Sequence, residues 1–434
     1  MSSILTNNGA MVALQTLQNI NKSLGQTQSE ISTGKSVGSA KDNAAVWAIS
    51  KQMESDVQGF KAIKESLALG ESTVAVARNA SETVTDLLTQ IKGKIVASQE
   101  DNVDRSKIQA DIVALRDQIG AVVGAAQFNG LNLLSNKETD AGSGSVDILA
   151  SLDRSASGVS SSSISVGKQD LGVEASSING TPTALATAAN NVTGEGDAAA
   201  FAIAGNATTR NDAVFEIGTT AADGVEAGQG YAITISAGAG AFGGTALNTT
   251  DLNDIKYVAR DGDTRADVAQ GLADSFNEYI KEKGFEDTGV QATVTDAGEV
   301  TVVGALVAAD GFSIAVNSYG SDDTTIGGGL EKLSGIDVSS EAGSEAALDQ
   351  IEGLIQTAID SSAAFGSSQG RIETQSDFIS KLSDSLKSGI GSLVDANMEE
   401  ASARLQALQV QQQLATQSLS IANQAPQSIL ALFR

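Results

Sequence analysis

Apolar residues at both ends of the chain follow the alternating three- and four-residue spacing of a heptad repeat. The N-terminal series comprises Ala10, Leu14, Leu17, Asn21, Leu24, Gln28 and Ile31. The C-terminal series comprises Met398, Ala401, Leu405, Leu408, Gln412, Ala415, Leu419 and Ala422. Because this spacing places the apolar side chains on one seam of a helix, it predicts two helices that pair with each other. Each would have about 30 residues and a length of about 45 Å, and an antiparallel arrangement would bring the termini together.

The C-terminal helix carries no charge over most of its length. Residues 405–433 contain no charged side chain between Arg404 and Arg434. They are too rich in glutamine to span a membrane, because a spanning helix needs about 20 predominantly apolar residues. Without charge they are also poorly suited to face water, so we predict that they are buried against protein. Pro426 is expected to end or kink the helix near Ala425.

Amides occupy some of the core-type positions of both series, namely Asn21, Gln28 and Gln412. Buried amides in a coiled coil lower its stability but specify its register and the number of its partners. We therefore expect these three side chains to help align the two helices.

Between the chain ends, the pattern changes twice. Periodic apolar positions in residues 40–137 and 345–390 predict helices of one bundle, and Asn129-Gly130 predicts a turn. Residues 138–341 are rich in Gly, Ser, Thr and Asp and contain short strand-type runs, including a predicted hairpin of VQATVT and EVTVVG. One helix, TRADVAQGLADSFNEYIKEKG, interrupts these runs.

These patterns predict a multidomain α+β fold in five segments. Residues 1–40 and 393–434 are expected to form the two halves of a coiled-coil domain. Residues 41–176, with a β-hairpin at 145–175, and residues 336–392 are expected to form the two parts of a helical bundle. Residues 177–335 are expected to form a β-rich α+β domain.

Composition limits the chemistry that the chain can perform. It has neither cysteine nor histidine, which excludes disulfides and thiolate metal sites and removes the commonest general base. We therefore expect no cofactor, no metal and no enzymatic activity, although carboxylate or Ser/Lys catalysis remains open. The start of the chain lacks a basic n-region and an uninterrupted apolar core, so a cleaved secretory signal is not expected.

The net charge of −26 is concentrated in the middle of the chain, because 30 of the 53 acidic residues lie between residues 138 and 341. Such a surface repels nucleic acid and anionic lipid. It predicts a well-solvated outward face instead.

Three short strings match catalytic or nucleotide-binding motifs. Gly366-Ser367-Ser368-Gln369-Gly370 fits GxSxG, which needs a histidine to take the serine proton. Gly34-Lys35-Ser36 resembles the end of a P-loop, although Ser29 stands where its first glycine belongs. Gly238, Gly240 and Gly243 fit GxGxxG after a predicted strand, but the sequence that follows is typical of turns and not of a helix. We interpret all three as structural.

Other polar groups are also better explained as ordinary surface. Asp261, Asp263 and the pair Asp322-Asp323 could contact calcium, but Arg265 stands at the fifth position of an EF-hand-type loop. Formal glycosylation triplets begin at Asn191, Asn206 and Asn248. Trp47 is expected to pack on an apolar helical face.

Several longer strings resemble bacterial flagellins. They include ISTGK at 31–35, SAKDNAAVWAIS at 39–50, AQFNGLNLL at 126–134 and SLVDANMEEASARLQALQVQQQLATQSLSIANQAPQSILALFR at the C-terminus. Glu30 replaces the arginine usual in the family, and Gly370 replaces the usual asparagine before Arg371. Residues 65–75 also lack the family's usual Asp-Gly-Ile-Ser type of stretch. Residues 88–95 lack the arginines that many members show where an innate immune receptor recognises them, so such recognition is not expected.

The resemblance implies a fold, partners and a location. In flagellins the terminal helices pair as an inner coiled coil, and the variable middle projects from a helical homopolymer. The resemblance implies export without a cleaved signal, an export chaperone for the C-terminal helix, and cap and hook-junction proteins as further partners, with an extracellular flagellar filament as the location. The expected assembly interface consists of Leu14, Leu17, Leu24, Ile31, Leu405, Leu408, Leu414, Leu419 and Ile421.

Two other functions remain open from the sequence. A hook–filament junction protein shares the pattern of terminal helices. A displayed ligand-binding or adhesin module could occupy the middle of the chain, although no aromatic repeat supports it. A dehydrogenase would depend on the glycines at 238–243 alone.

Overall fold

A computed structural model describes residues 7–155, 158–180, 191–192, 198–217, 225–236, 238–243, 246–249, 251–296 and 298–432. Two compact units make up the chain. The first comprises Met1–Ser66, Ala150–Ser162 and Gln375–Arg434, and the second comprises Leu67–Leu149 and Ser163–Thr374. The long helices α2 (Ala44–Ser98) and α5 (Glu341–Val394) contribute residues to both units.

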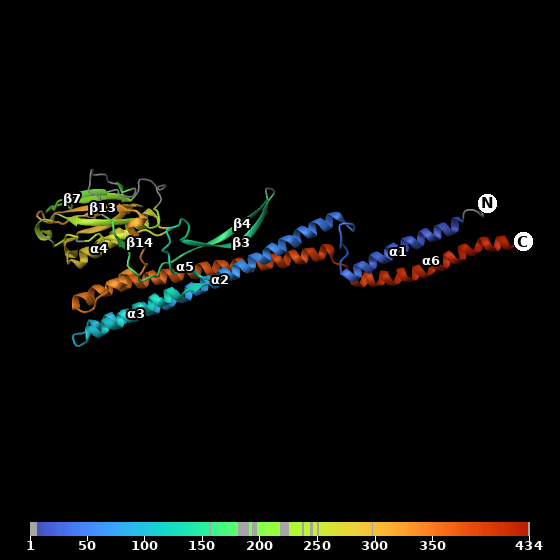
Figure 1. Ribbon diagram of the computed structural model, residues 1–434, viewed down its shortest axis with the longest axis horizontal. Helices are drawn as coiled ribbons and strands as arrows, with labels where there is room; N and C mark the ends of the chain where they lie inside the picture. Colours follow the sequence, from blue (N-terminus) through green and yellow to red (C-terminus); the bar gives the residue numbers. More distant parts are fainter. Residues whose placement is uncertain are drawn as a thin grey trace. The chain divides into compact units, whose positions relative to one another are not determined.

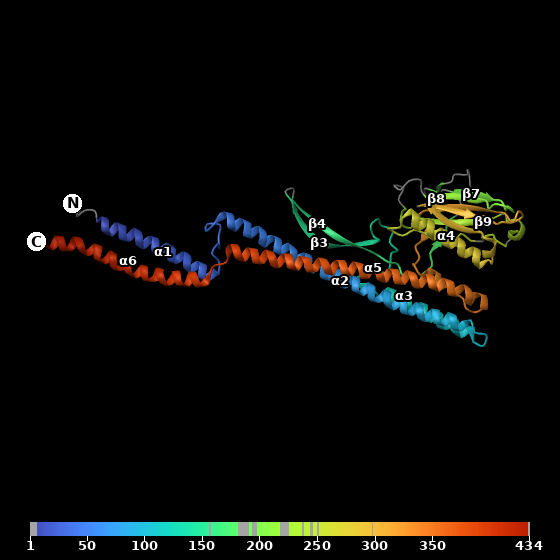
Figure 2. The same cartoon turned by 180° about the vertical axis from the view of Figure 1, so that it is seen from behind.

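In the first unit, α1 (Asn8–Thr33) and α6 (Met398–Leu432) lie side by side and antiparallel, with both termini at the same end (Figures 1 and 2). The side chain of Asn7 caps α1 by accepting a hydrogen bond from the backbone N–H of Ala10 at 3.1 Å. Gly34 ends α1 in the left-handed conformation at φ 70°. These boundaries confirm the predicted terminal helices and their pairing.

The seam of α6 follows the predicted series closely. From Ala401 to Ala422, every predicted position is buried or half-buried, while Met398 is 43% exposed. On α1 the prediction is half wrong. The half-buried or buried positions of α1 are Ala10, Ala13, Leu17, Ile20, Leu24, Thr27, Glu30 and Ile31, whereas Leu14, Asn21 and Gln28 are exposed.

The shift on α1 has a simple physical reason. The predicted and the observed series of buried positions share Ala10, Leu17, Leu24 and Ile31. At the positions between these, the observed residue precedes the predicted one by one place in the sequence. The observed phase buries Ile20 where the predicted phase would bury the amide of Asn21. Burying an isoleucine is favourable, whereas burying an unpaired amide has a cost.

Of the two outcomes expected at Pro426, an end or a kink near Ala425, the end is wrong, because α6 continues through Pro426 to Leu432. A proline at position 426 cannot donate to the carbonyl of Ala422, four residues earlier. In this structure the side-chain Nδ2 of Asn7 donates to that carbonyl at 2.8 Å. The helix therefore continues with its orphaned carbonyl satisfied by the other terminal helix.

The helical part of the second unit consists of α3 (Arg105–Ala125) and of segments of α2 and α5, which run side by side (Figure 1). Their buried residues recur at helical spacing, which confirms the predicted helices: Leu67, Val74, Val84, Leu88, Ile91 and Ile95 on α2, Ile112 and Ile119 on α3, and Ile351, Phe365 and Ile372 on α5. Asn129 and Gly130, with φ 52° and 83°, form the predicted turn between β1 (Gln127–Phe128) and β2 (Leu131–Asn132).

The strands β3 (Ser145–Ser155) and β4 (Gly158–Gly167) form a two-stranded sheet, as predicted for the hairpin at residues 145–175. Two further short strands, β5 (Ser177–Ile178) and β14 (Thr324–Thr325), pair antiparallel. Their pairing places the entry to the strand-rich region beside its exit.

The strand-rich region contains two four-stranded sheets. One has the order β10–β9–β13–β7 and the other the order β11–β12–β8–β6. The strands are β6 (Asn191–Val192), β7 (Ala198–Ile203), β8 (Asp212–Ile217), β9 (Gly230–Ser236), β10 (Lys256–Val258), β11 (Gln291–Asp296), β12 (Glu299–Val303) and β13 (Phe312–Tyr319). The β11–β12 hairpin confirms the predicted one, whereas β7 and β10 were not predicted.

Both sheets and α4 (Arg265–Glu282) share one hydrophobic core. Thr264 and Asp267 form a capping box at the start of α4. Phe242 stands edge-on to Phe285 and Phe312, with ring centroids 5.1 and 5.7 Å apart. Together with the long helices, this core makes the fold multidomain α+β, as predicted. Short 3-10 helices occur at η1 (Gly240–Phe242), η2 (Glu286–Thr288), η3 (Ser321–Asp323) and η4 (Glu331–Gly335).

Candidate functional site

The nine residues expected at an assembly interface fall into two groups in the structure. Six of them are half-buried on the seam between the terminal helices: Leu17, Leu24, Ile31, Leu405, Leu408 and Leu419. The other three, Leu14, Leu414 and Ile421, are 47%, 57% and 68% exposed. The pairing of α1 with α6 therefore occupies the first group and leaves the second group available on the outside.

The exposed group extends into an apolar outer face on each helix. On α6, Val410 is 56% exposed and precedes Leu414 and Ile421 by four and eleven residues, a spacing that places all three on one side of a helix. On α1, Met11 and Val12 are 63% and 64% exposed close to Leu14. We call these six residues the outer apolar face. The sequence analysis did not place Met11, Val12 and Val410 at the interface, although it placed Leu14, Leu414 and Ile421 there.

Amides bridge the two helices at the edge of the seam. The Nε2 of Gln412 donates to Oδ1 of Asn21 at 2.7 Å. Asn21 therefore contacts α6 although it is not a core residue of α1. The pair aligns the two helices without placing a charge on them.

The segment that follows α1 is hydrogen-bonded to the segment that precedes α6. The backbone N–H groups of Ser36 and Ala396 donate to the carbonyls of Val394 and Gly34 at 2.7 and 2.9 Å. Close by, Asp42 accepts hydrogen bonds from the N–H and Oγ of Ser39 at 2.9 and 3.0 Å. These bonds from Ser39 hold the pKa of the Asp42 carboxyl below its usual value. The string SAKDNA thus builds a rigid turn between α1 and α2.

The motif-like strings have structural roles. Gly366–Gly370 lies inside α5, so it forms no strand–turn–helix elbow. Gly34-Lys35-Ser36 follows the end of a helix, whereas a P-loop precedes one. In the loop at Gly238–Gly243, the N–H of Ala241 donates to Oδ1 of Asp310 at 2.8 Å. A carboxylate of the chain itself therefore occupies a donor that a nucleotide phosphate would need.

Carboxylates of the acidic loop at residues 261–263 accept hydrogen bonds from other residues of the chain. Oδ2 of Asp261 accepts from the N–H of Gly144 at 2.6 Å, and Oδ2 of Asp263 accepts from the hydroxyl of Tyr257 at 2.8 Å. Within the described ranges, no group of three acidic, histidine or cysteine side chains is placed to hold a metal ion. Trp47 is half-buried on α2.

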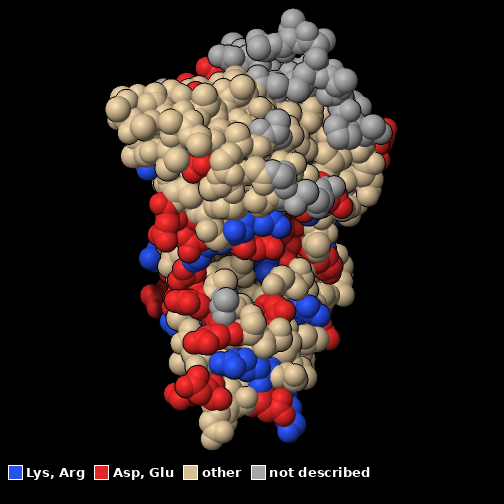
Figure 3. Space-filling view, turned by 90° about the vertical axis from the view of Figure 1, so that its left-hand side faces the viewer, with Lys and Arg blue, Asp and Glu red and all other residues tan. Residues whose placement is uncertain are grey.

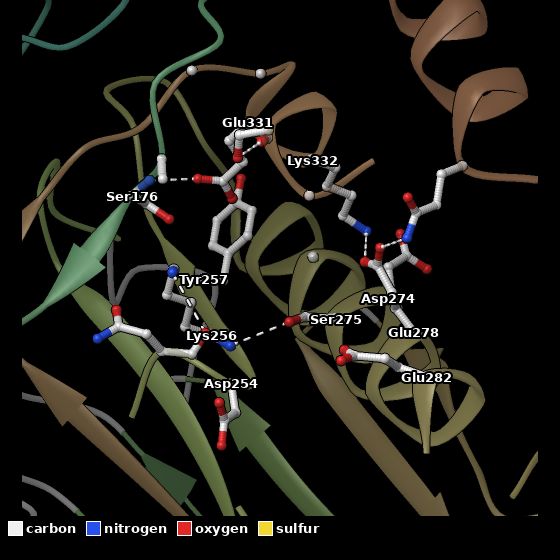
Figure 4. A pocket seen from close by; sticks show the side chains of 18 of the residues that line it. Ser176, Asp254, Lys256, Tyr257, Asp274, Ser275, Glu278, Glu282, Glu331 and Lys332 are labelled. Atoms are coloured by element: carbon white, nitrogen blue, oxygen red, sulfur yellow. Dashed lines mark hydrogen bonds and ion pairs between the residues drawn. The ribbon is translucent and has the colours of Figure 1, made fainter. Parts of the chain in front are cut away.

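A polar cavity of about 620 Å³ lies in the second unit between α4, β10, η4 and the start of α5 (Figure 4). Glu278 of α4 accepts hydrogen bonds from Lys332 at 2.6 Å and from Gln350 of α5 at 2.8 Å. Glu331 accepts from the backbone N–H of Ser176 at 2.6 Å. Burial raises the pKa of the hydroxyl of Tyr257, a residue that lines this cavity. Among these contacts, the bond between Glu278 and Gln350 links α4 of the strand-rich region to α5.

Figure 3 shows the side of the molecule that carries the strand-rich region, and charged side chains are unevenly distributed over this face. Acidic and basic side chains gather over the lower half of this face, whereas the strand-rich part above them shows few charges. The well-solvated outward face expected for the middle of the chain stays a prediction.

Two protein-family models match the chain. The bacterial flagellin N-terminal helical region matches residues 4–139, and the C-terminal helical region matches residues 348–433. Flagellin A of Rhizobium meliloti is 35% identical over 446 residues, covering 100% of both chains. Flagellin of Brucella melitensis biotype 1 is 28% identical over 435 residues, again covering 100% of both.

Solved structures give a weaker likeness. Xanthomonas campestris FlgL has a TM-score of 0.32 at 13% identity, covering 79% of this chain and 99% of that one. FliC from Burkholderia pseudomallei has a TM-score of 0.30 at 12% identity, covering 70% and 99%. Such scores are too low to support an inference. Among the helices that the structure describes, none combines the length and the hydrophobicity needed to cross a membrane.

Proposed function

Because the chain belongs to the bacterial flagellin family, it is a structural subunit of the extracellular flagellar filament, and we propose that it polymerises through the outer apolar face of α1 and α6. The observation that carries this proposal is the exposure of Leu414 and Ile421 on a helix whose sequence has no charge from residue 405 to residue 433. Soluble monomers rarely expose such a surface unless it binds a partner.

The energetics favour burial of this face in a polymer. Each fully buried leucine or isoleucine stabilises an interface by about 1.5–3 kcal/mol. Ordering the backbone opposes this by about 1–2 kcal/mol per residue, which favours helices that are already paired along the seam. Contacts between different surfaces of successive copies propagate without closing, so they generate a helical filament.

Membership of the flagellin family suggests a role for each of the five predicted segments. Residues 1–40 and 393–434 would line the filament core, residues 41–176 and 336–392 would surround it, and residues 177–335 would face outward. The chain would catalyse no reaction. Its partners besides further copies would be an export chaperone covering the uncharged helix, and the cap and hook-junction proteins. Export would proceed without a cleaved signal.

The junction-protein and adhesin alternatives have no specific observation in their favour. The relatives that match the whole chain are flagellins, and the likeness to FlgL rests on TM-scores near 0.3. In the polar cavity between α4 and η4, Glu278 and Glu331 are already hydrogen-bonded to neighbouring elements.

Leu414→Asp tests the proposal directly. It places an uncompensated carboxylate on the outer apolar face and leaves the seam intact, so the critical concentration for filament growth should rise at least tenfold. Sedimentation of polymer from a concentration series measures this change. The matched control is Leu306→Asp, because Leu306 is 44% exposed in the strand-rich region. Normal polymerisation of Leu414→Asp, or equal loss in both variants, would contradict the proposal.

A further inference from the structure

Asn7, at the start of α1, contacts the backbone of α6. Its Oδ1 accepts from the N–H of Ala10, and its Nδ2 donates to the carbonyl of Ala422. These two bonds fix the orientation of the amide, because only the oxygen can accept and only the nitrogen can donate. One short side chain therefore caps α1 and contacts α6 at the same time.

The carbonyl of Ala422 differs chemically from the other interior carbonyls of α6. The chain has two prolines, Pro182 and Pro426, so Pro426 is the only one in α6. Its missing N–H removes the helical partner of the Ala422 carbonyl and of no other carbonyl in the helix. A slip of one residue would move α6 by about 1.5 Å and rotate it by about 100°, which would separate Asn7 from its acceptor.

We propose that Asn7 is a positioning residue that sets the register of α1 against α6 by donating to the carbonyl that Pro426 leaves free. This inference rests on the proposed function, because register in the helix pair determines how the outer apolar face is presented to the next subunit. The Gln412–Asn21 bond marks a second point of the same register. A correctly aligned pair polymerises at a lower subunit concentration than a slipped one.

Three substitutions separate this role from simple helix capping. Asn7→Asp keeps the capping oxygen and places a favourable negative charge at the helix start, but it loses the donor. Asn7→Ala loses both. Pro426→Ala restores a backbone N–H for Ala422 and makes Asn7 dispensable. Asn8→Asp adds the same charge at the neighbouring exposed position and is the matched control.

The critical concentration for filament growth of the full chain is the measurement. Asn7→Asp should raise it about three- to tenfold, as expected for one lost hydrogen bond, whereas Asn8→Asp should leave it within twofold. In the Pro426→Ala background, Asn7→Asp should also change it less than twofold. This rescue is the result that a capping role alone would not produce.

Each contrary result has a defined meaning. The inference is overturned if Asn7→Asp polymerises as the wild type does, if its defect is equally large in the Pro426→Ala background, or if Pro426→Ala alone abolishes polymerisation. Failure of the wild-type chain to form filaments would instead contradict the proposed function. If the wild-type chain forms filaments and Leu414→Asp does not, the proposed function holds. The Asn7 variants then test the register alone.

Discussion

At the scale of single residues, short polar side chains fix the ends of the helices. Asp104 caps α3 by accepting from the N–H of Lys107 at 3.3 Å, and it also pairs with the Nζ of Lys107 at 2.9 Å. The side-chain hydrogen bond from Lys107 is the main reason that the pKa of Asp104 lies below its usual value of 3.8. A depressed pKa in the folded state means that the ionised carboxylate stabilises the fold.

The pH dependence of Asp104→Asn follows from this shift. The contribution of Asp104 is present above pH 3.8 and is lost as the pH falls through the lower folded-state pKa. The variant should therefore melt slightly below the wild type at pH 7, and the difference should vanish in strong acid. Thermal unfolding followed by circular dichroism at several pH values measures this. Asp101→Asn, in the same exposed loop, is the control, and an equal deficit at every pH would refute the assignment.

At the scale of elements, the two connections to the strand-rich region cross in close backbone contact. A Cβ on Gly328 would lie 2.1 Å from the carbonyl carbon of Gly172. The N–H groups of Gly328 and Leu330 donate to the carbonyls of Glu174 and Gly172, both at 2.8 Å. Since backbone atoms cannot move aside as a flexible side chain can, this crossing makes the junction rigid.

Gly328→Ala should therefore destabilise the second unit by about 1–3 kcal/mol or more, as an overpacked contact does. Gly335→Ala is the matched control, because a Cβ there meets no atom within 4 Å, and it should be neutral or slightly stabilising. Urea unfolding of the full chain compares the two variants. Equal stability of both would show that the connections do not cross as described.

The same junction shows where prediction from sequence ends. Helices, the hairpins and the α6 seam were predictable because their patterns are local and periodic. The Gly327–Gly329 contact was not, because its partner lies about 155 residues earlier in the chain and no local pattern joins the two. The prediction for α1 failed for a different reason, because it placed the amide of Asn21 at a core position although the neighbouring Ile20 is more favourable to bury. Asn7 was missed because its acceptor is 415 residues away.

At the scale of the whole molecule, the proposed function places assembly on the terminal helices and leaves the strand-rich region outside the assembly interface. The outer apolar face lies on α1 and α6, whereas the strand-rich region has its own hydrophobic core. The antiparallel pairing of β5 with β14 brings Ser177 opposite Thr325, so the chain enters and leaves the strand-rich region at neighbouring points. The account therefore predicts that this region can be removed without loss of the polymer.

Negative-stain electron microscopy of three concentrated chains tests this central claim most directly: the full-length chain, a version ending at Arg404, and a version lacking residues 177–335. The account predicts long filaments from the full-length chain and from the internal deletion, and none from the version that lacks most of α6. Filaments from the version ending at Arg404, or their absence from the internal deletion, would contradict assembly through the paired terminal helices.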